Sequence, residues 1–563
     1  MRKFLKFLSQ RIVIVTFLIF LQVLWFVGLF LKFTSYSQYI TAAFKILSIL
    51  VVIYIMNRSD NPSVKLVWVI VILLFPLFGG LLYLTIGGKQ PISYLRKKLE
   101  PMIEESERHL KTDPQIEEEL KLTDGSTASQ IYYLEHQSGF PAYKDSKVDY
   151  YPSGEECFRI MVEELKKAQK YIYLEYFIIE EGIMWNTILD ILEEKVKAGV
   201  DVRVMYDDVG CIFNLPSHYA DSLRKKGIKC VVFNRYIPVF STVFNNRDHR
   251  KILVIDGNVA FTGGINFADE YINEKQRFGY WKDNGVRITG KAVYSMIQMF
   301  LQMWNAFAPE KEKLDYEKFS LEEVALLPEK ERGIVLPYSD HPLDSEFVGE
   351  SVYINLINSA QKYIYFFTPY LIIDNEVVTA LILAAKRGVD VRIITPGIPD
   401  KKMIFLVTQS YYPQLVEGGV KIFQYRPGFV HAKCAVCDDK IATVGTINLD
   451  YRSLYLHFEN GLFLYDCDTV MAIKQDILDT LEDCNHITEE MCKKNMFFLL
   501  LQGILRIFAP LLYKVFIKSS TKRFREHIKD SIIKNRRNYV TETIGKRNRG
   551  KINGKLREFC KSI

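Results

Sequence analysis

The sequence predicts an α/β protein built from two similar halves that follow a membrane anchor. Three observations predict this fold class: a polar motif that occurs twice, apolar strands that alternate with helices in both halves, and long apolar runs near the N-terminus. With 563 residues, 49% of them hydrophobic, the chain can form several domains with large cores.

The repeated motif begins with histidine. DHRKILVIDGNVAFTGGIN ends at Asn266, and HAKCAVCDDKIATVGTIN ends at Asn448. A single His-x-Lys on a short strand would mean little, because it occurs by chance in many sheets. Five positions, however, keep the same spacing in both copies: His249, Lys251, Asp256, Gly263 and Asn266 in the first, and His431, Lys433, Asp438, Gly445 and Asn448 in the second. This agreement indicates a duplication.

The repeat extends upstream of the motif. AQKYIYLEYFII and KAGVDVRVMYDD in the first half are echoed in the same order by AQKYIYFFTPYLII and KRGVDVRIITPG in the second. Each half reads as a strand, a helix that ends near a glycine (Gly199 or Gly388), a second strand, a further helix and then the motif. This alternation predicts a largely parallel sheet covered by helices.

The N-terminal end is apolar enough to anchor the chain in a membrane. Ile12–Leu31 and Leu66–Ile86 are each long enough to span a bilayer, and Tyr39–Met56 is a weaker span because Lys45 interrupts it. No small-residue cleavage site follows the first run, so we expect a retained anchor. Basic residues flank the three apolar runs on both sides, which favours a cytoplasmic location for both ends of the set. Three complete spans would instead put the two ends on opposite sides of the membrane. Either one of the last two runs fails to cross fully, or the N-terminus lies outside.

The C-terminal end differs from the rest of the chain in charge. From residue 513 to 563 there are sixteen Lys or Arg against four acids, although the whole chain carries only +7. The preceding FFLLLQGILRIFAPLL is apolar and suited to a membrane interface. The basic tail would be attracted to anionic lipid, but charge alone fits a solvated tail or nucleic-acid binding about as well.

The cysteines indicate a reducing compartment. Nine occur without regular spacing, several of them in apolar strands. Cys434 and Cys437 form a Cys-x-x-Cys, but residues three apart on a strand face opposite sides, so packing is the better interpretation than zinc or redox chemistry.

The duplicated motif predicts one shared site. Because side chains alternate along a strand, each histidine lies on the same face as its lysine. If the halves pack about a pseudo-twofold axis, two histidines face each other between two lysines and two asparagines. One imidazole can then attack the phosphorus of a phosphodiester while the other protonates the leaving alkoxide, and a second alcohol reverses the roles. Lys251, Lys433, Asn266 and Asn448 would hold the phosphate oxygens, so this chemistry needs no metal. Nearby carboxylates can tune the two histidines, and Asp283 and Glu459 are the candidates.

These residues resemble the phospholipase D superfamily, whose HxKxxxxD motifs are followed by Gly-Gly or Gly-Thr and Asn. Within this superfamily, the chain is similar to bacterial cardiolipin synthases over about residues 61–512. The segments that carry this similarity are KLVWVIVILLFPLFGGLLYLTIGG, EYFII, MYDDVG, FGYWKDNGVRITG, TPYLII and GTINLDYRSLYLHFE. The resemblance implies two phospholipase D-type α-β-α sandwich halves, and transfer of a phosphatidyl group between two phosphatidylglycerols through a phosphohistidine, without metal or cofactor. It also implies a multi-pass protein of the bacterial cell membrane with its catalytic part in the cytoplasm.

The resemblance also assigns roles. It implies that His249 and His431 are the catalytic pair, with His249 the nucleophile, that Lys251 and Lys433 bind phosphate, and that Asp256 and Asp438 are structural support. Asn266 and Asn448 lie beside them, and Asp283 and Glu459 orient the histidines. Three features depart from the family: His457 replaces a common asparagine, Ile12–Leu31 is an extra apolar run, and the basic tail extends past the usual end.

We expect the following division of the chain: 1–88 membrane anchor, 89–147 helical connector, 148–310 first half, 311–349 linker, 350–496 second half, 497–512 interfacial helix, and 513–563 basic tail.

Other functions use the same residues. A hydrolytic phospholipase D would use water as acceptor, and a related transferase would use another alcohol. A nuclease is disfavoured by the retained apolar runs, so we expect phosphatidylglycerol, other anionic phospholipids and the membrane as partners rather than nucleic acid. An inactive scaffold is disfavoured because both motifs are intact. Asp207 and Asp208 are predicted either to contact substrate or to cap a helix.

Overall fold

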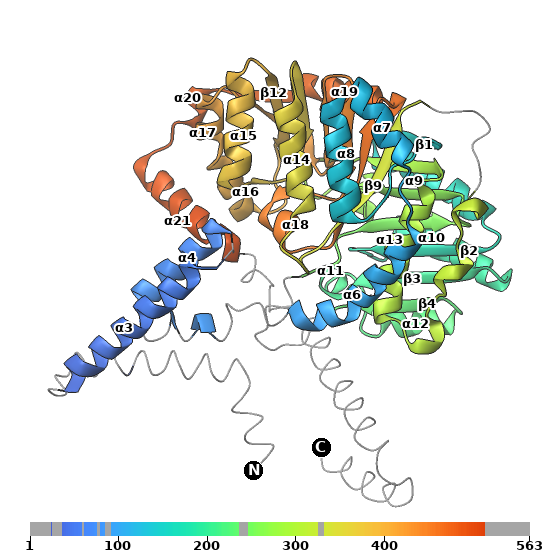
Figure 1. Cartoon of the computed structure of the whole chain (residues 1–563), viewed down its shortest axis with the longest axis horizontal. Helices are drawn as coiled ribbons and strands as arrows, with labels where there is room; N and C mark the ends of the chain where they lie inside the picture. The colour runs from blue at the N-terminus through green and yellow to red at the C-terminus, as the bar shows by residue number, and fades with distance from the viewer. Residues whose placement is uncertain are drawn as a thin grey trace, which may run out of the picture.

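The computed structural model (Figure 1) describes residues 24, 36–58, 61–75, 79–80, 82–84, 92–235, 246–324 and 332–512. Apart from Leu24, the apolar run Ile12–Leu31 lies outside the described residues, and so does the basic tail 513–563.

Two sheets with matching strand order form the body of the molecule (Figure 1). The first has seven strands in the order β1-β8-β6-β5-β2-β3-β4. The second has eight in the order β9-β18-β16-β15-β10-β12-β13-β19, so it repeats the first and adds one edge strand. The duplication read from the sequence is therefore a duplication of the whole sheet.

The first half begins at the end of the connector. Its elements are β1 (Ser146–Tyr151), α9 (Gly154–Lys167), β2 (Tyr171–Tyr176), α10 (Ile183–Lys197), β3 (Asp201–Asp207), α11 (Asp208–Cys211), α12 (Tyr219–Lys225), β4 (Lys229–Phe233), β5 (Lys251–Ile255), β6 (Val259–Gly263), β7 (Tyr280–Lys282), β8 (Gly285–Gly290) and α13 (Val293–Phe307). A 3-10 turn, η3 (Asp269–Ile272), precedes β7, and three more follow α13: η4 (Glu310–Glu312), η5 (Tyr316–Lys318) and η6 (Leu321–Glu323).

The second half repeats this order. Its elements are β9 (Ile334–Asp340), α14 (Val348–Ser359), β10 (Tyr363–Phe367), β11 (Leu371–Ile372), α15 (Asn375–Lys386), β12 (Asp390–Pro396), α16 (Lys402–Gln409), α17 (Tyr412–Glu417), β13 (Lys421–Tyr425), β14 (Gly428–Val430), β15 (Cys434–Cys437), β16 (Ile441–Gly445), β17 (Leu449–Asp450), α18 (Tyr451–Tyr455), β18 (Glu459–Tyr465), α19 (Asp468–Glu482), β19 (Cys484–Ile487) and α20 (Glu489–Cys492). As predicted, α10 and α15 end near Gly199 and Gly388, which have φ of 90° and 91°.

The prediction of largely parallel sheets was wrong. In the first sheet only β2/β3 and β3/β4 are parallel, while β2/β5, β5/β6, β6/β8 and β1/β8 are antiparallel. The second sheet is mixed in the same way. The cause is the motif, because its strand enters beside β2 in the opposite direction and a tight turn returns it as a hairpin. Helical crossovers, which produce parallel pairs, are confined to the region before the motif.

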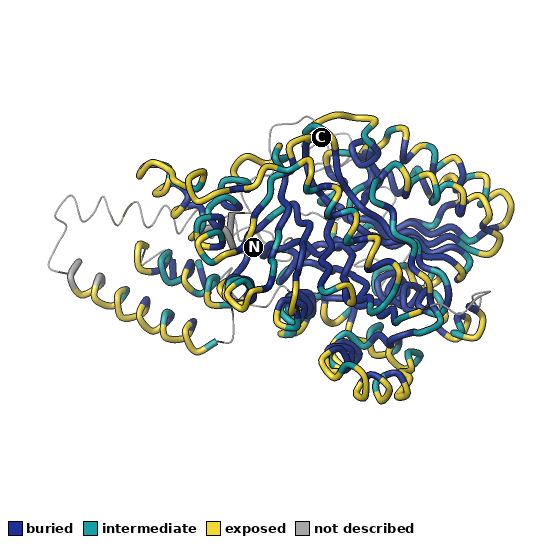
Figure 2. Tube along the Cα trace, turned by 90° about the horizontal axis from the view of Figure 1, so that it is seen from above, coloured by how far each residue is buried: buried dark blue, intermediate teal, exposed yellow. Residues whose placement is uncertain are grey.

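The two halves share one core. Helices α13 and α19 lie between the sheets, where Phe300, Trp304 and Ile473 pack with strand residues of both halves. Separate apolar clusters fill the space between each sheet and its outer helices. Figure 2 shows the buried strands running through the centre with exposed helical surfaces outside. Because apolar burial across the seam is continuous, the halves form one body.

The predicted connector is helical and joins both halves. It contains α6 (Ile92–His109), α7 (Pro114–Thr123) and α8 (Gly125–Ser138), and α6 packs on α13 while α8 packs on α14 and β9. The predicted linker 311–349 requires correction, because β9 lies inside it and pairs with β18 along its whole length. The apolar run IVLPY of β9 is buried as an edge strand, so the second half begins before residue 350.

The anchor region folds beside the second half. Helix α3 (Tyr36–Met56) packs on α4 (Pro62–Leu74), and α4 contacts α21 (Met496–Leu512). The run Leu66–Ile86 does not continue as one helix, because α4 ends at Leu74 and Gly79 lies against the backbone of Val71 and Ile72. None of the helices in the described ranges combines the length and apolar character needed to cross a membrane.

Candidate active site

The two motif histidines are both buried and each lies just before a central strand. His249 precedes β5 and His431 precedes β15, and their relative exposures are 7% and 8%. Each main chain is tied to the opposite half: His249 N–H donates to the Phe458 carbonyl at 2.9 Å, and His431 N–H donates to the Lys282 carbonyl at 2.7 Å. Both imidazoles are therefore set at the seam between the halves.

The acids that bond to the histidines are exchanged between the halves. His249 Nδ1 lies 2.9 Å from both carboxylate oxygens of Glu459 in the second half. His431 Nδ1 lies 2.8 Å from Asp283 Oδ2 in the first half. Each imidazole therefore has its Nδ1 engaged, and an Nδ1–H donated to a carboxylate leaves Nε2 to act as a nucleophile or base.

Two short strand pairings produce this exchange. β7 pairs in parallel with β14, which aligns Trp281 with Phe429 and Lys282 with Val430, so the next residues, Asp283 and His431, meet. At the related position Asp248 forms a parallel bridge with Phe458, which brings His249 to Glu459. The site is complete only when both halves contribute.

The motif lysines form the floor of the site. Lys251 and Lys433 are 1% and 0% exposed, and each Nζ donates to the carbonyl of its own motif histidine. Burial lowers the pKa of Lys251 to about 8 and that of Lys433 to about 7. No described carboxylate forms an ion pair with either Nζ, although Glu459 and Asp283 are near enough to act on both lysines electrostatically. Buried ammonium groups of this kind are well suited to receive a phosphate anion.

The electrostatics differ between the two histidine–acid pairs. Burial and the nearby lysines lower the pKa of both imidazoles, that of His431 to about 4. Burial raises the pKa of Glu459 to about 8. Burial would raise the pKa of Asp283 too, but the adjacent His431 and Lys433 outweigh it, so this pKa lies below its usual value. Asp283 is therefore the stronger counter-ion for an imidazolium.

The residues after the motif glycine make room for these acids. A Cβ at Gly264 would overlap Asp283 Oδ1, so the Gly-Gly of the first copy permits the close approach of the aspartate. In the second copy Thr446 takes this position, and its hydroxyl donates to Glu459 Oε2. The difference between Gly-Gly and Gly-Thr thus matches the difference between the two acids.

The motif asparagines are both buried but are held differently. Asn266 accepts from Ile178 N–H at 3.1 Å and donates to the Tyr271 hydroxyl at 2.7 Å. Asn448 keeps a buried Oδ1 with no hydrogen-bond partner among the described residues. Asn266 thus supports its surroundings, whereas Asn448 Oδ1 has no partner within the described part of the chain.

The motif aspartates lie at the far ends of the strands. Asp256 accepts three backbone N–H groups, from Gln169, Lys170 and Tyr171, at 2.7 to 2.8 Å. Asp438 accepts the equivalent three, from Gln361, Lys362 and Tyr363, at 2.6 to 2.9 Å. Both aspartates have φ of 54°, the left-handed conformation of the hairpin turn. This geometry ties the motif strand to its neighbour and contacts neither histidine.

Arg247 and Tyr271 were missed by sequence reasoning, and His457 was noted there only as a departure from the family. Arg247 is fully buried against Asp207, with Nε 2.8 Å from Oδ2, directly before the first motif. The ring of His457 lies 5.7 Å from that of His249, and its buried Nδ1 has no hydrogen-bond partner in the described structure. Tyr271 lies 5.4 Å from His431, ring to ring. Comparison of the repeats finds only symmetric residues.

The structure also shows the positions of Asp207, Trp281 and the cysteines. Asp207 caps α11 by accepting Gly210 N–H at 2.8 Å, as one of the two alternatives predicted. Trp281 packs 5.2 Å from the His431 ring, and its Nε1 donates to Asp283 at 3.3 Å. Cys434 and Cys437 belong to apolar clusters on opposite faces of the second sheet. The eight cysteines in the described structure are free thiols.

Comparison with known proteins agrees with this architecture. A family model described as "Cardiolipin synthase, PLD-like domain" matches residues 161–304 and 353–480, and one described as "Phospholipase_D-nuclease N-terminal" matches residues 46–88. A cardiolipin synthase of Halalkalibacterium halodurans is 32% identical over 514 residues, which are 90% of this chain and 100% of that protein. The cardiolipin synthase 2 of Bacillus anthracis is 34% identical over 464 residues, 82% of this chain and 89% of that protein.

A solved structure supports the fold. The crystal structure of a phosphatidylserine synthase from Haemophilus influenzae superposes with a TM-score of 0.50 at 17% identity, covering 64% of this chain and 92% of that chain.

Proposed function

Because this chain belongs to the family of phospholipase D-like cardiolipin synthases, we propose that it transfers a phosphatidyl group from one phosphatidylglycerol to another, giving cardiolipin and glycerol. The observation that carries the proposal is the exchanged pair of histidine–carboxylate contacts above two buried lysines. Such a site provides two imidazoles and a binding place for one phosphodiester.

The first step forms a covalent intermediate. Nε2 of one histidine attacks phosphorus, the bond from phosphorus to the glycerol oxygen breaks, and the other histidine gives its proton to that oxygen. We assign the attack to His249 and the proton donation to His431. Asp283 supports this assignment, because an ionised carboxylate at 2.8 Å stabilises the protonated form of His431.

The second step regenerates the enzyme. The glycerol hydroxyl of a second phosphatidylglycerol gives its proton to the now neutral His431, its oxygen attacks phosphorus, and the bond from phosphorus to His249 breaks. Lys251 and Lys433 hold the non-bridging oxygens in both steps. An anionic phosphate also raises the pKa of the nearby imidazoles, so the substrate itself favours the protonated His431 that the first step requires.

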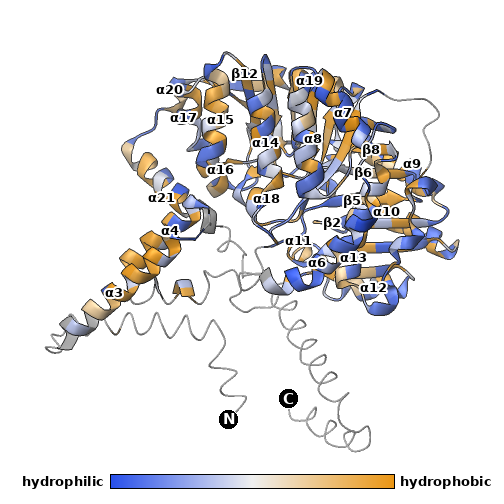
Figure 3. Ribbon diagram, in the orientation of Figure 1, coloured by the Kyte–Doolittle hydropathy of each residue, from blue (hydrophilic) through white to orange (hydrophobic). Residues whose placement is uncertain are grey.

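Attachment to a membrane places the site near its lipids. The ribbons of α3, α4 and α21 are coloured as largely hydrophobic (Figure 3). Their exposed apolar side chains include Tyr39, Ile46, Ile49, Leu50, Leu66, Leu73, Leu499, Leu500 and Ile504. Because contiguous exposed apolar surface marks a membrane or protein interface, we assign these three helices to the bilayer of a bacterial cell membrane. In this assignment α4, with Gly79 and Tyr83 packed against it, belongs to a hairpin anchor, and the free thiols favour a cytoplasmic catalytic part.

A product assay tests the function. The purified full chain in neutral detergent is incubated with labelled phosphatidylglycerol and EDTA, and the lipids are separated. Cardiolipin with an equal amount of free glycerol is expected. Phosphatidic acid as the sole labelled product would instead make the protein a phospholipase D, and no product in the absence of added alcohols would place the acceptor in another class.

A further inference from the structure

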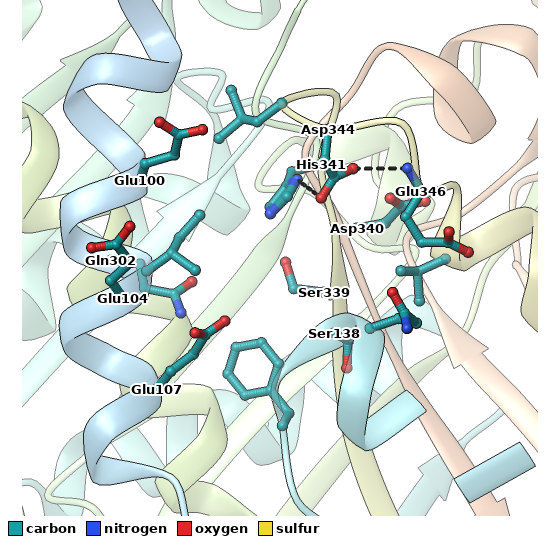
Figure 4. Close-up of a pocket in the computed structure, with 15 residues that line it drawn as sticks. Glu100, Glu104, Glu107, Ser138, Gln302, Ser339, Asp340, His341, Asp344 and Glu346 are labelled. Atoms are coloured by element: carbon teal, nitrogen blue, oxygen red, sulfur yellow. Dashed lines mark hydrogen bonds and ion pairs between the residues drawn. The ribbon is translucent and has the colours of Figure 1, made fainter. Parts of the chain in front are cut away.

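A cavity lies between the connector and the second half, outside the cluster of catalytic histidines and lysines. Its volume is about 180 Å³, and it is a partly open cavity lined by α6, the end of α8, α13 and the loop between β9 and α14 (Figure 4). Six carboxylates line it and no lysine or arginine does: Glu100, Glu104, Glu107, Asp340, Asp344 and Glu346.

Part of this negative charge has no partner in the described structure. Glu100 pairs with Arg96 at 3.2 Å, and Asp344 pairs at 3.6 Å with His341, which also lines the cavity. The Tyr133 hydroxyl donates to Glu346, whereas the exposed Glu104 and Glu107 have no ion pair with any described residue. Asp340 is 4% exposed and is held by backbone N–H groups such as that of Gly349, at 2.8 Å. Burial raises its pKa to about 8, and burial with the adjacent Glu104 raises the pKa of Glu107. A bound cation would relieve this repulsion.

A neutral side chain in the cavity independently points to a ligand. Gln302 of α13 is 6% exposed, makes no hydrogen bond to a described residue, and extends its amide into the cavity (Figure 4). Because the amide faces the cavity rather than a protein partner, it is free to hydrogen-bond to a molecule bound there. Its carbonyl can accept from an ammonium group.

The arrangement of the carboxylates indicates the shape of the cation. Within the described residues no three acidic, histidine or cysteine side chains gather closely enough to hold one metal ion. Glu100, Glu104 and Glu107 instead follow one face of α6, so the Cβ atoms of neighbouring members are about 5–6 Å apart and the row is roughly 10 Å long. Asp340, Asp344 and Glu346 form the opposite wall.

We propose that this cavity binds a linear polyamine, whose ammonium groups pair successively with the row of glutamates on α6 and with Gln302. Such a ligand joins the connector helix to the loop after β9. Because Ser339 Oγ donates to the Glu459 carbonyl at 3.3 Å and Asp340 pairs with Glu459 in the sheet, the occupied cavity braces the strand that carries a catalytic-site carboxylate.

Calorimetry with spermidine tests the proposal on the full chain in neutral detergent, at fixed ionic strength and without lipid. One spermidine per chain is expected, with a thermal midpoint raised by a few degrees. The double variant Glu104→Gln/Glu107→Gln should bind at least tenfold more weakly, and Gln302→Leu severalfold more weakly. Glu105→Gln is the matched control, because Glu105 is on the same helix but pairs with Arg108 at 2.9 Å outside the cavity.

Three results would overturn the proposal: no saturable binding to the folded wild type, equal binding by the double variant and the control, or displacement of spermidine by equimolar Mg²⁺. If a variant fails to fold, competition between spermidine and putrescine on the wild type decides instead. The longer polyamine should win at least tenfold, since it spans the row of glutamates. Equal affinity would contradict that geometry.

Discussion

At the scale of single residues, the account depends on two histidines that cannot replace each other. His249→Ala and His431→Ala should each lower cardiolipin formation by roughly 10²–10⁴-fold, because one loses the nucleophile and the other the proton donor. Initial rates with labelled phosphatidylglycerol measure this. Near-normal activity in either variant, with normal thermal stability, would refute a shared site.

The pKa values of the two motif lysines predict how kcat/KM falls at alkaline pH. Only a charged lysine binds phosphate well, and burial lowers the pKa of Lys433 to about 7 and of Lys251 to about 8. The charge is present below these values and is lost as the pH rises through them, so kcat/KM should fall between about pH 7 and 8. Lys433→Arg keeps its charge at all these pH values and should move the decline upward, at a lower maximum. An unchanged decline in this variant would assign it to another group.

Gly264 should be unusually intolerant of substitution. A Cβ there would overlap Asp283 Oδ1, so Gly264→Ala should displace Asp283 from His431 and lower kcat by about 10–100-fold, the range expected for displaced supporting groups. Gly125→Ala is the control, because a Cβ at Gly125 meets nothing within 4 Å. Equal activities of the two variants would mean that the position of Asp283 does not matter for turnover.

At the scale of elements, the motif aspartates should act on stability. Asp438 accepts three backbone N–H groups at the start of β10, and its removal leaves these donors without partners. Asp438→Ala should therefore lower the free energy of unfolding by about 2–4 kcal/mol. Denaturant unfolding measures the loss. The rate per folded molecule should stay within about twofold, and a large loss of rate without a loss of stability would assign Asp438 a direct role.

The exchange of Asp283 and Glu459 between the halves is also set by the pairing of elements, and the sequence did not predict it. The spacing of His249 and Lys251 predicted one shared face, and the repeat predicted that the halves meet. Nothing local indicated that Asp283 would bond to His431 rather than to His249, because that depends on the pairing of β7 with β14 across 148 residues. Long-range pairing of two three-residue strands leaves no periodic pattern in either segment.

At the scale of the whole molecule, the apolar surface of α3, α4 and α21 should hold the enzyme at lipid. Leu500 and Ile504 are 64% and 47% exposed on α21. Leu500→Asn/Ile504→Asn should weaken binding to phosphatidylglycerol vesicles at least tenfold, since each lost apolar contact is worth about 1.5–3 kcal/mol when fully buried. Leu383→Asn, at a side chain 51% exposed on α15, is the control. Equal binding by both variants would exclude α21 from the interface.

The overall architecture was predictable where the sequence repeats and unpredictable where it does not. Strands β2, β3, β10 and β12 and the glycines that end α10 and α15 follow from apolar runs and turn residues. The directions of β5 and β15 could not be predicted in this way, because an apolar strand sequence does not indicate whether the strand runs parallel or antiparallel to its neighbours. β9 was assigned to a linker because the prolines near it suggested irregular chain, although Pro337 is tolerated in an edge strand.

The division of labour between the two histidines is tested most directly with a phosphatidyl ester of p-nitrophenol. This leaving group departs without protonation, so a variant that retains the nucleophile still forms the covalent intermediate and releases one equivalent of nitrophenol in a burst. We expect the burst from wild type and from His431→Ala, and none from His249→Ala. Bursts of equal size from both variants would contradict a single phosphohistidine at His249.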